Sequence, residues 1–187
     1  MGIHSYLQRA AETIVDTTAH LPEDRVNAAI TVIADALMSG APLLVCGNGG
    51  SASDAMHITG ELVGRFLKER KALNCICLSD NPAVITAWSN DYSYDTVFER
   101  QVEAYGRAGG VIWGLSTSGN SQNVCLAFDK ASRIGMTTIG TTGKGGGKLA
   151  ARSNILLDVA STHTPEIQQI HLCLFHYICE EVERRTA

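Results

Sequence analysis

Five short, almost continuously apolar segments follow residue 40, and amphipathic segments separate them. The five segments are Pro42–Cys46, Leu73–Leu78, Val111–Leu115, Met136–Ile139 and Ile155–Val159. Runs this apolar are typical of parallel strands covered on both faces, because a half-exposed strand would alternate apolar with polar residues. Strands that alternate with helices favour an α/β fold with a doubly wound, five-stranded parallel sheet flanked by helices.

The segments between these strands have the apolar spacing or the end signals of helices. Helices are expected over Ser53–Phe66, Pro82–Trp88, Tyr94–Tyr105, Asn120–Ile134 and about Pro165–Arg184. Apolar residues also recur at helical spacing from Ile3 to about Ser39, with a break at Leu21-Pro22-Glu23-Asp24. We therefore expect an N-terminal helical hairpin at about residues 3–39. A hairpin this apolar needs a partner surface, and a second subunit would supply one.

Length and composition limit the function classes. A chain of 187 residues can fill one hydrophobic core, so we expect a single domain over residues 1–187. The net charge of −4, without a Lys/Arg cluster, argues against a nucleic acid partner. The N-terminus lacks the pattern of a secretory signal, and no apolar stretch approaches the roughly 20 residues that span a bilayer. We expect a cytoplasmic protein without a membrane partner, with its six cysteines reduced and mostly buried.

Two loops rich in glycine and hydroxyl groups follow predicted strands directly and precede predicted helices. The first loop is Gly47-Asn48-Gly49-Gly50-Ser51, and the second loop is Ser116-Thr117-Ser118-Gly119-Asn120-Ser121. In open parallel sheets, ligands bind beyond the carboxyl ends of the strands, where the strand order reverses. Backbone N–H groups at a helix N-terminus and side-chain hydroxyls are donors that suit a phosphate group. The two loops together therefore favour a site for a monophosphate.

Each loop taken alone has another interpretation, because Ser, Thr, Asn and Gly are the commonest helix caps and turn formers. The first loop also departs from two nucleotide-binding motifs. It lacks the Gly-Lys-Ser/Thr of a P-loop, and Cys77-Leu78-Ser79 stand where a dinucleotide-binding fold would carry an acidic residue. Two such loops at equivalent strand ends are nonetheless more typical of a ligand site than of caps.

Three motifs in order resemble those of the phosphoheptose isomerases, a family built on the sugar isomerase (SIS) domain. They are the first loop followed by Asp54-Ala55-Met56-His57, the second loop, and Ile167-Gln168-Gln169-Ile170-His171. The resemblance runs from the N-terminal helices to the end of the chain. It implies a homotetramer that interconverts sedoheptulose 7-phosphate and D-glycero-D-manno-heptose 7-phosphate, with zinc in its active site.

The resemblance also implies roles for individual residues. The residues that would hold the phosphate are Ser51, Ser116, Thr117, Ser118 and Ser121. Asn48 and Asp91 would lie against the sugar hydroxyls, and Gly49, Gly50 and Gln168 would also contact the substrate. The residues that match positions used for zinc or for catalysis are His57, Glu61, Gln168 and His176.

The spacing of these last residues can be tested against helix geometry. His57 and Glu61 are four apart on one predicted helix and project from the same face, which fits either a site or an exposed polar stripe. Gln168 lies eight residues before His176, about 12 Å along a straight helix, which is long for two ligands of one ion. The helix would have to bend there, or the glutamine would have to come from a neighbouring subunit. His171 has no partner in the sequence, and we expect a satisfied histidine of the core or of an interface.

Isomerisation through an enediol needs a base near C1 and C2 and an acid for the oxygens. We expect Glu61 as the base and His176 as the acid, although Glu61 could also bind zinc. An alternative from another class is a non-catalytic tetrameric adaptor that binds a bacterial replication initiator protein. Such an adaptor is a relative of the phosphoheptose isomerases, but it lacks the acidic residue at the position of Glu61 and the histidine at that of His176. A third interpretation is a phosphosugar-sensing module of a transcriptional regulator. Such modules usually accompany a DNA-binding segment, and this chain has no basic helix-turn-helix segment.

Overall fold

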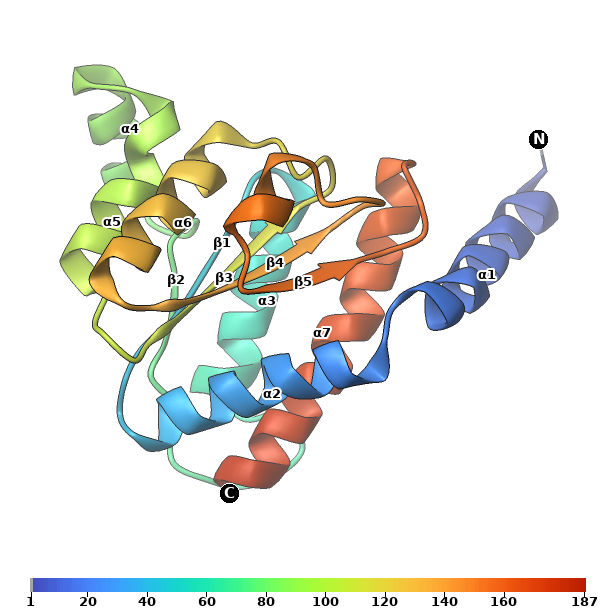
Figure 1. Ribbon diagram of the computed structural model, residues 1–187, viewed down its shortest axis with the longest axis horizontal. Helices are drawn as coiled ribbons and strands as arrows, with labels where there is room; N and C mark the ends of the chain where they lie inside the picture. The colour runs from blue at the N-terminus through green and yellow to red at the C-terminus, as the bar shows by residue number, and fades with distance from the viewer. Residues whose placement is uncertain (1) are drawn as a thin grey trace.

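Five parallel strands form the central sheet, in the order β2-β1-β3-β4-β5 (Figure 1). The strands are β1 (Leu43–Gly47), β2 (Cys75–Cys77), β3 (Val111–Ser116), β4 (Thr137–Thr142) and β5 (Ile155–Asp158). The structure is a computed structural model that describes residues 2–187. All four neighbouring strand pairs are parallel, which confirms the predicted doubly wound sheet.

The helices alternate with these strands along the chain. They are α1 (Ile3–His20), α2 (Glu23–Met38), α3 (Gly50–Val63), α4 (Pro82–Asp91), α5 (Val97–Tyr105), α6 (Gln122–Ile134) and α7 (Thr164–Thr186), with short 3₁₀ helices η1 (Tyr94–Thr96) and η2 (Gly147–Arg152). One predicted helix, over Tyr94–Tyr105, is divided into η1 and α5. Another begins earlier than predicted, at Gly50 rather than Ser53, because Gly49 adopts a positive φ of 56° and lets the helix start directly after it.

The sheet separates two apolar layers. Leu43 and Val45 face the layer formed with α2, α3 and α7, whereas Leu44 and Cys46 face the layer formed with α5 and α6. Because successive side chains of a strand point to opposite faces, a strand buried on both faces must be apolar throughout. The burial of every residue of β1 and β3 follows from this arrangement.

The strand order reverses between β1 and β3. From β1 the chain passes to β2 on one side, and it then returns to build β3, β4 and β5 on the other side. The first loop leaves the carboxyl end of β1, and the second loop leaves the carboxyl end of β3, where the two strands are paired up to Gly47 and Leu115. The two loops are therefore neighbours at the switch point of the sheet, where open α/β sheets bind ligands.

The first helix projects from the body as an arm (Figure 1). The two N-terminal helices form as predicted, but α1 does not fold back along α2 as a closed hairpin and instead contacts α7. The reason is the connection: Leu21 and Pro22 both have extended backbone conformations, which redirect the chain without reversing it. Thr17 is the one buried residue of α1.

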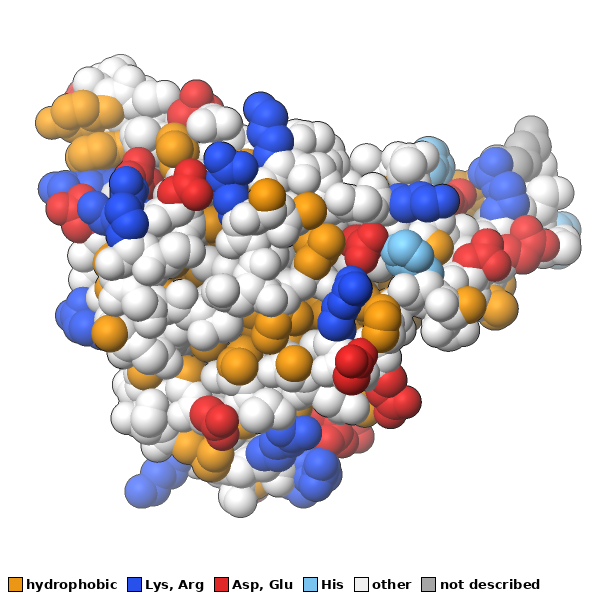
Figure 2. All heavy atoms as spheres, viewed as in Figure 1, with side chains coloured by type: hydrophobic (Ala, Val, Ile, Leu, Met, Phe, Trp, Pro, Cys, Tyr) orange, Lys and Arg blue, Asp and Glu red, His pale blue; other side chains and the backbone are white. Residues whose placement is uncertain are grey.

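The arm carries exposed apolar side chains among charged ones (Figure 2). The large exposed apolar residues of α1 are Ile3, Leu7, Ile14 and Val15. Its attachment to the body includes a polar contact, since Nε2 of His20 lies 2.9 Å from a carboxylate oxygen of Asp158. No helix within residues 2–187 is long and apolar enough to cross a membrane.

Candidate active site

The first and second loops form the walls of one polar pocket, which we call the two-loop pocket. Its lining residues are Asn48, Gly50, Ser51, Leu115, Ser116, Thr117, Ser118, Ser121, Thr164 and Gln168. Most of the residues that the sequence predicted for substrate binding are therefore brought together. The lining offers hydroxyl, amide and backbone donors and includes no Lys or Arg, so an anion would be held by dipoles and hydrogen bonds.

Close packing explains a glycine of the first loop. A Cβ on Gly50 would collide with Nε2 of Gln168, so the absence of a side chain lets Gln168 of α7 approach the start of α3. The same contact puts the amide of Gln168 beside the N-terminus of α3. The backbone N–H groups of Ser51 and Ala52 donate to the carbonyls of Asn48 and Gly49 at 3.0 Å, whereas that of Gly50 has no partner within residues 2–187 and is open to an anion.

The second loop is held in shape by its own hydroxyl groups and by the loop after β4. The Oγ atoms of Ser116 and Ser121 are 2.9 Å apart, and Oγ of Ser118 accepts a hydrogen bond of 3.1 Å from the backbone of Asn120. The backbone N–H of Gly143 donates to the carbonyl of Thr117 at 3.0 Å. The hydroxyls therefore surround the start of α6 in a fixed arrangement.

A second cluster of predicted residues lies further along α3 and α7. One possible ligand atom from each of His57, Glu61 and His176 lies within 4.8 Å of the others. His57 Nε2 is 2.9 Å from a carboxylate oxygen of Glu61, and the rings of His57 and His176 are 5.0 Å apart, edge to face. Two imidazoles and one carboxylate are a donor set that zinc accepts. The predicted projection of His57 and Glu61 from one helix face is confirmed.

Two predicted residues lie outside this second cluster. Gln168 contacts Gly50 in the two-loop pocket, and α7 runs as one unbroken helix between Gln168 and His176, without the bend that a shared ion would favour. Asp91 is the last residue of α4, where its carboxylate accepts a hydrogen bond of 2.9 Å from Asn90. Asp91 is not among the lining residues of the two-loop pocket.

A buried carboxylate fastens the segment after α3 to α7. Glu183, 1% exposed, accepts hydrogen bonds of 2.7 to 2.9 Å from three successive backbone N–H groups. Those groups belong to Phe66, Leu67 and Lys68. Arg70 lies 3.2 Å from Glu183 and donates to the carbonyl of Glu61 at 2.8 Å. The helix that carries His176 and the end of the helix that carries Glu61 are thus tied together.

His171 was expected to be a histidine of the core or of an interface with its hydrogen bonds satisfied. It is fully buried in the chain, as expected of a core histidine, but neither ring nitrogen has a hydrogen-bond partner within residues 2–187. Burial lowers the pKa of His171 to about 4, and a contact with the backbone of Thr142 opposes that shift only in part. Asp54 is perturbed in the opposite sense: burial raises the pKa of its carboxyl to about 6, partly offset by His57.

Sequence reasoning missed three residues of the site. Tyr94 donates a hydrogen bond of 2.6 Å to the side-chain oxygen of Asn48, and Asn123 exchanges two hydrogen bonds with the same amide. Thr164 lines the pocket, with its hydroxyl 3.4 Å from that of Thr117. The position of Asn123, two residues after the second loop, was the one signal available. Nothing in the sequence pointed to Tyr94.

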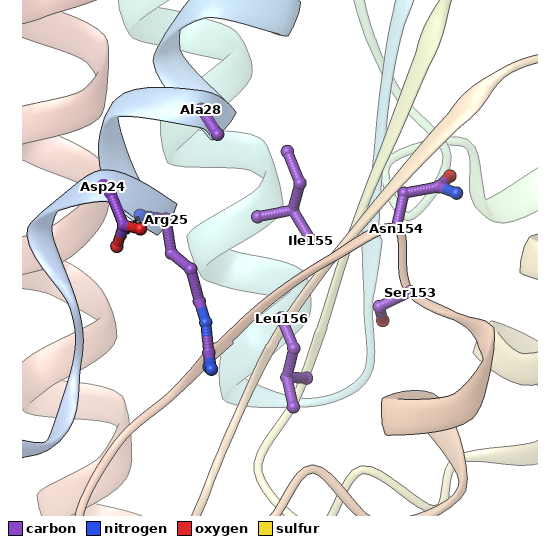
Figure 3. Close-up of a pocket in the computed structure, with 7 residues that line it drawn as sticks. All are labelled: Asp24, Arg25, Ala28, Ser153, Asn154, Ile155 and Leu156. Atoms are coloured by element: carbon purple, nitrogen blue, oxygen red, sulfur yellow. Dashed lines mark hydrogen bonds between the residues drawn. The ribbon is translucent and has the colours of Figure 1, made fainter.

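Another hollow lies between α2 and the edge strand β5 (Figure 3). It is lined by Asp24, Arg25, Ala28, Ser153, Asn154, Ile155 and Leu156. Asp24 and Arg25 belong to α2, and Ile155 and Leu156 belong to β5. None of the predicted site residues lines this hollow, which is at the edge of the sheet rather than at the switch point.

Comparison with known proteins agrees with these features. Residues 5–143 match the model of the SIS domain family. The chain is 52% identical over 154 residues to the phosphoheptose isomerase of Crocosphaera subtropica, a match that covers 82% of this chain and 79% of that protein. It is 44% identical over 181 residues to the phosphoheptose isomerase of Rhodospirillum rubrum, a match that covers 97% of this chain and 95% of that protein.

Solved structures agree as well. The phosphoheptose isomerase of Francisella tularensis superposes with a TM-score of 0.93 at 33% identity, covering 97% of this chain and 96% of that chain. The phosphoheptose isomerase of Neisseria gonorrhoeae superposes with a TM-score of 0.90 at 34% identity, covering 97% of each chain. The alternative of a replication adaptor receives no support from these matches. The chain belongs to the phosphoheptose isomerase family of SIS domain proteins.

Proposed function

We propose that this chain interconverts sedoheptulose 7-phosphate and D-glycero-D-manno-heptose 7-phosphate through an enediol. Membership of the family makes it an isomerase that acts on a sugar phosphate. The observation that carries the proposal is the pairing of a polar anion pocket with a separate group of two histidines and a glutamate on the same two helices.

The distance between these two features suits a long sugar phosphate. Gly50 and His57 are seven residues apart on α3, which is about 10 Å along the helix axis. In a heptose 7-phosphate the phosphate and the reacting carbons C1 and C2 are at opposite ends of the carbon chain. A substrate whose phosphate lies in the two-loop pocket would therefore extend its reacting end toward Glu61 and His176.

The phosphate would be bound by side-chain hydroxyls, by the backbone N–H of Gly50 at the start of α3 and by backbone N–H groups at the start of α6. The hydroxyls are those of Ser51, Ser116, Thr117, Ser118 and Ser121. The sugar hydroxyls would be contacted by Asn48 and Gln168. Asp91 would join them if the substrate extends past the pocket toward the end of α4.

Glu61 would act as the base and His176 as the acid. In the ketose-to-aldose direction, Glu61 takes a proton from C1 while His176 donates one to the oxygen on C2, which gives the enediol. Glu61 then returns its proton to C2, and the hydroxyl on C1 gives its proton back to His176 as the aldehyde forms. The protons balance, and a single base serves both carbons because they are neighbours.

His57, Glu61 and His176 fit zinc. Gln168 of the same chain lies in the two-loop pocket, so the fourth ligand proposed from the sequence would have to be the glutamine of a neighbouring subunit. Zinc bound there would polarise the substrate carbonyl, which is worth several kcal/mol of transition-state stabilisation. Without an ion, the hydrogen bond of 2.9 Å between Nε2 of His57 and Glu61 would hold the carboxylate in place.

We also infer a single domain over residues 1–187 that forms a homotetramer in the cytoplasm. The exposed apolar side chains of α1 support contacts between subunits. The six cysteines are all free, as is usual in a reducing compartment.

The experiment is to incubate the purified protein with sedoheptulose 7-phosphate and to follow aldose formation, with and without a chelator. Glu61→Gln should lower kcat by about 10²- to 10⁴-fold, because a positioned proton-transfer group contributes that much. Glu69→Gln is the matched control, since Glu69 is exposed on the segment after α3, and it should leave kcat unchanged. Full activity of Glu61→Gln would rule out the proposed base.

A further inference from the structure

The side chain of Asn48 is held by hydrogen bonds from two distant parts of the chain. Its Nδ2 donates to Oδ1 of Asn123 at 2.9 Å, and its Oδ1 accepts from Nδ2 of Asn123, also at 2.9 Å. Oδ1 of Asn48 accepts a second bond of 2.6 Å from the hydroxyl of Tyr94. Tyr94 is 46 residues and Asn123 is 75 residues away along the chain. The amide is thus fixed by η1 and α6 together.

The direction of these bonds is set by a backbone group. A reciprocal pair of amides would look the same if both amides were turned over, so the pair alone does not define which atom is oxygen. The backbone N–H of Val124 donates to Oδ1 of Asn123 at 3.0 Å, however, and a backbone N–H can only donate. This anchors the oxygen of Asn123. It follows that Asn48 must present its nitrogen to that oxygen and its own oxygen to the nitrogen of Asn123.

The hydrogen-bonding capacity of Asn48 can then be counted. A side-chain amide has one oxygen with two acceptor positions and one nitrogen with two N–H groups. Both acceptor positions of Asn48 are filled, by Tyr94 and Asn123, and one N–H is used by Asn123. Within residues 2–187, one N–H of Asn48 is left without a partner, and Asn48 lines the two-loop pocket. Asn48 can therefore only donate to a ligand.

We propose that Tyr94 and Asn123 are positioning residues that aim the remaining N–H of Asn48 at an oxygen of the bound sugar. Asn123 is 3% exposed, so its bonds to Asn48 are shielded from water on one side. Tyr94 is half-exposed at the other side and fills the second acceptor position of the Asn48 oxygen. With that position filled, the amide does not turn to offer its oxygen to a sugar hydroxyl. The inference rests on the proposed function, because it takes the ligand to be a sugar phosphate.

The test uses the full chain and measures the Kd of sedoheptulose 7-phosphate by titration calorimetry, together with kcat and the Kd of inorganic phosphate. Tyr94→Phe removes one hydroxyl and should raise the Kd of the sugar phosphate about fivefold, the usual effect of one hydrogen bond. It should leave the Kd of inorganic phosphate and kcat within about twofold, because the contact is made to the sugar in ground and transition states alike. Tyr105→Phe, the same change at an exposed tyrosine of α5, should alter none of these values.

A double substitution separates positioning from direct contact. In an Asn48→Ala background, Tyr94→Phe should have no further effect on the Kd of the sugar phosphate, because the hydroxyl acts through the amide that is missing. Additive effects of Asn48→Ala and Tyr94→Phe would overturn the inference, as would a Tyr94→Phe variant with the Kd of the unsubstituted chain. An equal rise in the Kd of inorganic phosphate would also contradict it. Turnover by the unsubstituted chain tests the proposed function, so a failure of that function is distinguishable from a failure of this inference.

Discussion

Replacing His171 by leucine should make the protein less sensitive to mild acid. The imidazole of His171 is fully buried and has no hydrogen-bond partner within residues 2–187, so the folded chain keeps it neutral. Burial lowers its pKa from 6.5 to about 4. Below pH 6.5 the unfolded chain binds a proton at this residue that the folded chain does not bind, and the free energy of unfolding therefore falls as the pH falls.

The size of the effect follows from the two pKa values. Each pH unit between them costs about 1.4 kcal/mol, so lowering the pH from 6.5 to 5 removes about 2 kcal/mol. The loss would level off near pH 4, where the folded state also begins to bind the proton. His171→Leu removes the titrating ring and its unpartnered nitrogens while keeping an apolar side chain in the core. Its unfolding free energy should fall by about 2 kcal/mol less than that of the unsubstituted chain between pH 7 and pH 5.

The assay is urea unfolding at pH 7 and pH 5, at one protein concentration, since association of subunits would shift the midpoints. At a typical slope, about 2 kcal/mol corresponds to a shift of about 1 M in the urea midpoint. His4→Leu on the exposed face of α1 is the control and should follow the unsubstituted chain. If His171→Leu loses as much stability as the unsubstituted chain between the two pH values, the burial of a neutral ring is not the cause.

Two substitutions test packing around the site by urea unfolding. Glu183→Gln should lower the unfolding free energy by about 3 kcal/mol, because it leaves Arg70 buried without its charge partner, whereas Glu181→Gln, at an exposed ion pair, should change it by less than about 1 kcal/mol. Gly114→Ala should cost about 1–3 kcal/mol, because its Cβ would lie 2.6 Å from the ring of Phe128, whereas a Cβ on Gly60 in α3 meets no atom within 4 Å, and Gly60→Ala should not destabilise. A milder effect at Gly114 than at Gly60 would contradict this account of the sheet packing.

The sheet could be predicted from the sequence because burial on both faces leaves a direct mark on composition. The apolar run at Val111–Leu115 coincides with β3 almost to the residue. For β4 the prediction ended at Ile139, but the strand continues to Thr142, since its threonines are buried and hydrogen-bonded. The hydroxyl of Thr141, for example, accepts a bond of 2.7 Å from the indole of Trp113. A polar residue satisfied by a distant partner looks like a loop residue in the sequence.

In the site, too, contacts between distant segments could not be predicted from local sequence. The loops and the pair of His57 with Glu61 are local patterns, and both could be read from spacing. The contact of Tyr94 with Asn48 depends on the fold bringing distant segments together, and no local pattern encodes it. The direction of α1 could not be predicted either, because the break before α2 has a sequence signature but the angle across it does not.

The parallel packing of α3 and α7 has a consequence for how the chain acquires activity during folding. Glu183 of α7 binds the backbone of Phe66, in the segment just after α3, and these two residues are 117 apart in sequence. Closing so long a loop is a slow, late step compared with forming single helices. During refolding, the helical circular dichroism signal should therefore recover earlier than isomerase turnover. An early intermediate would have most of its helices while remaining inactive.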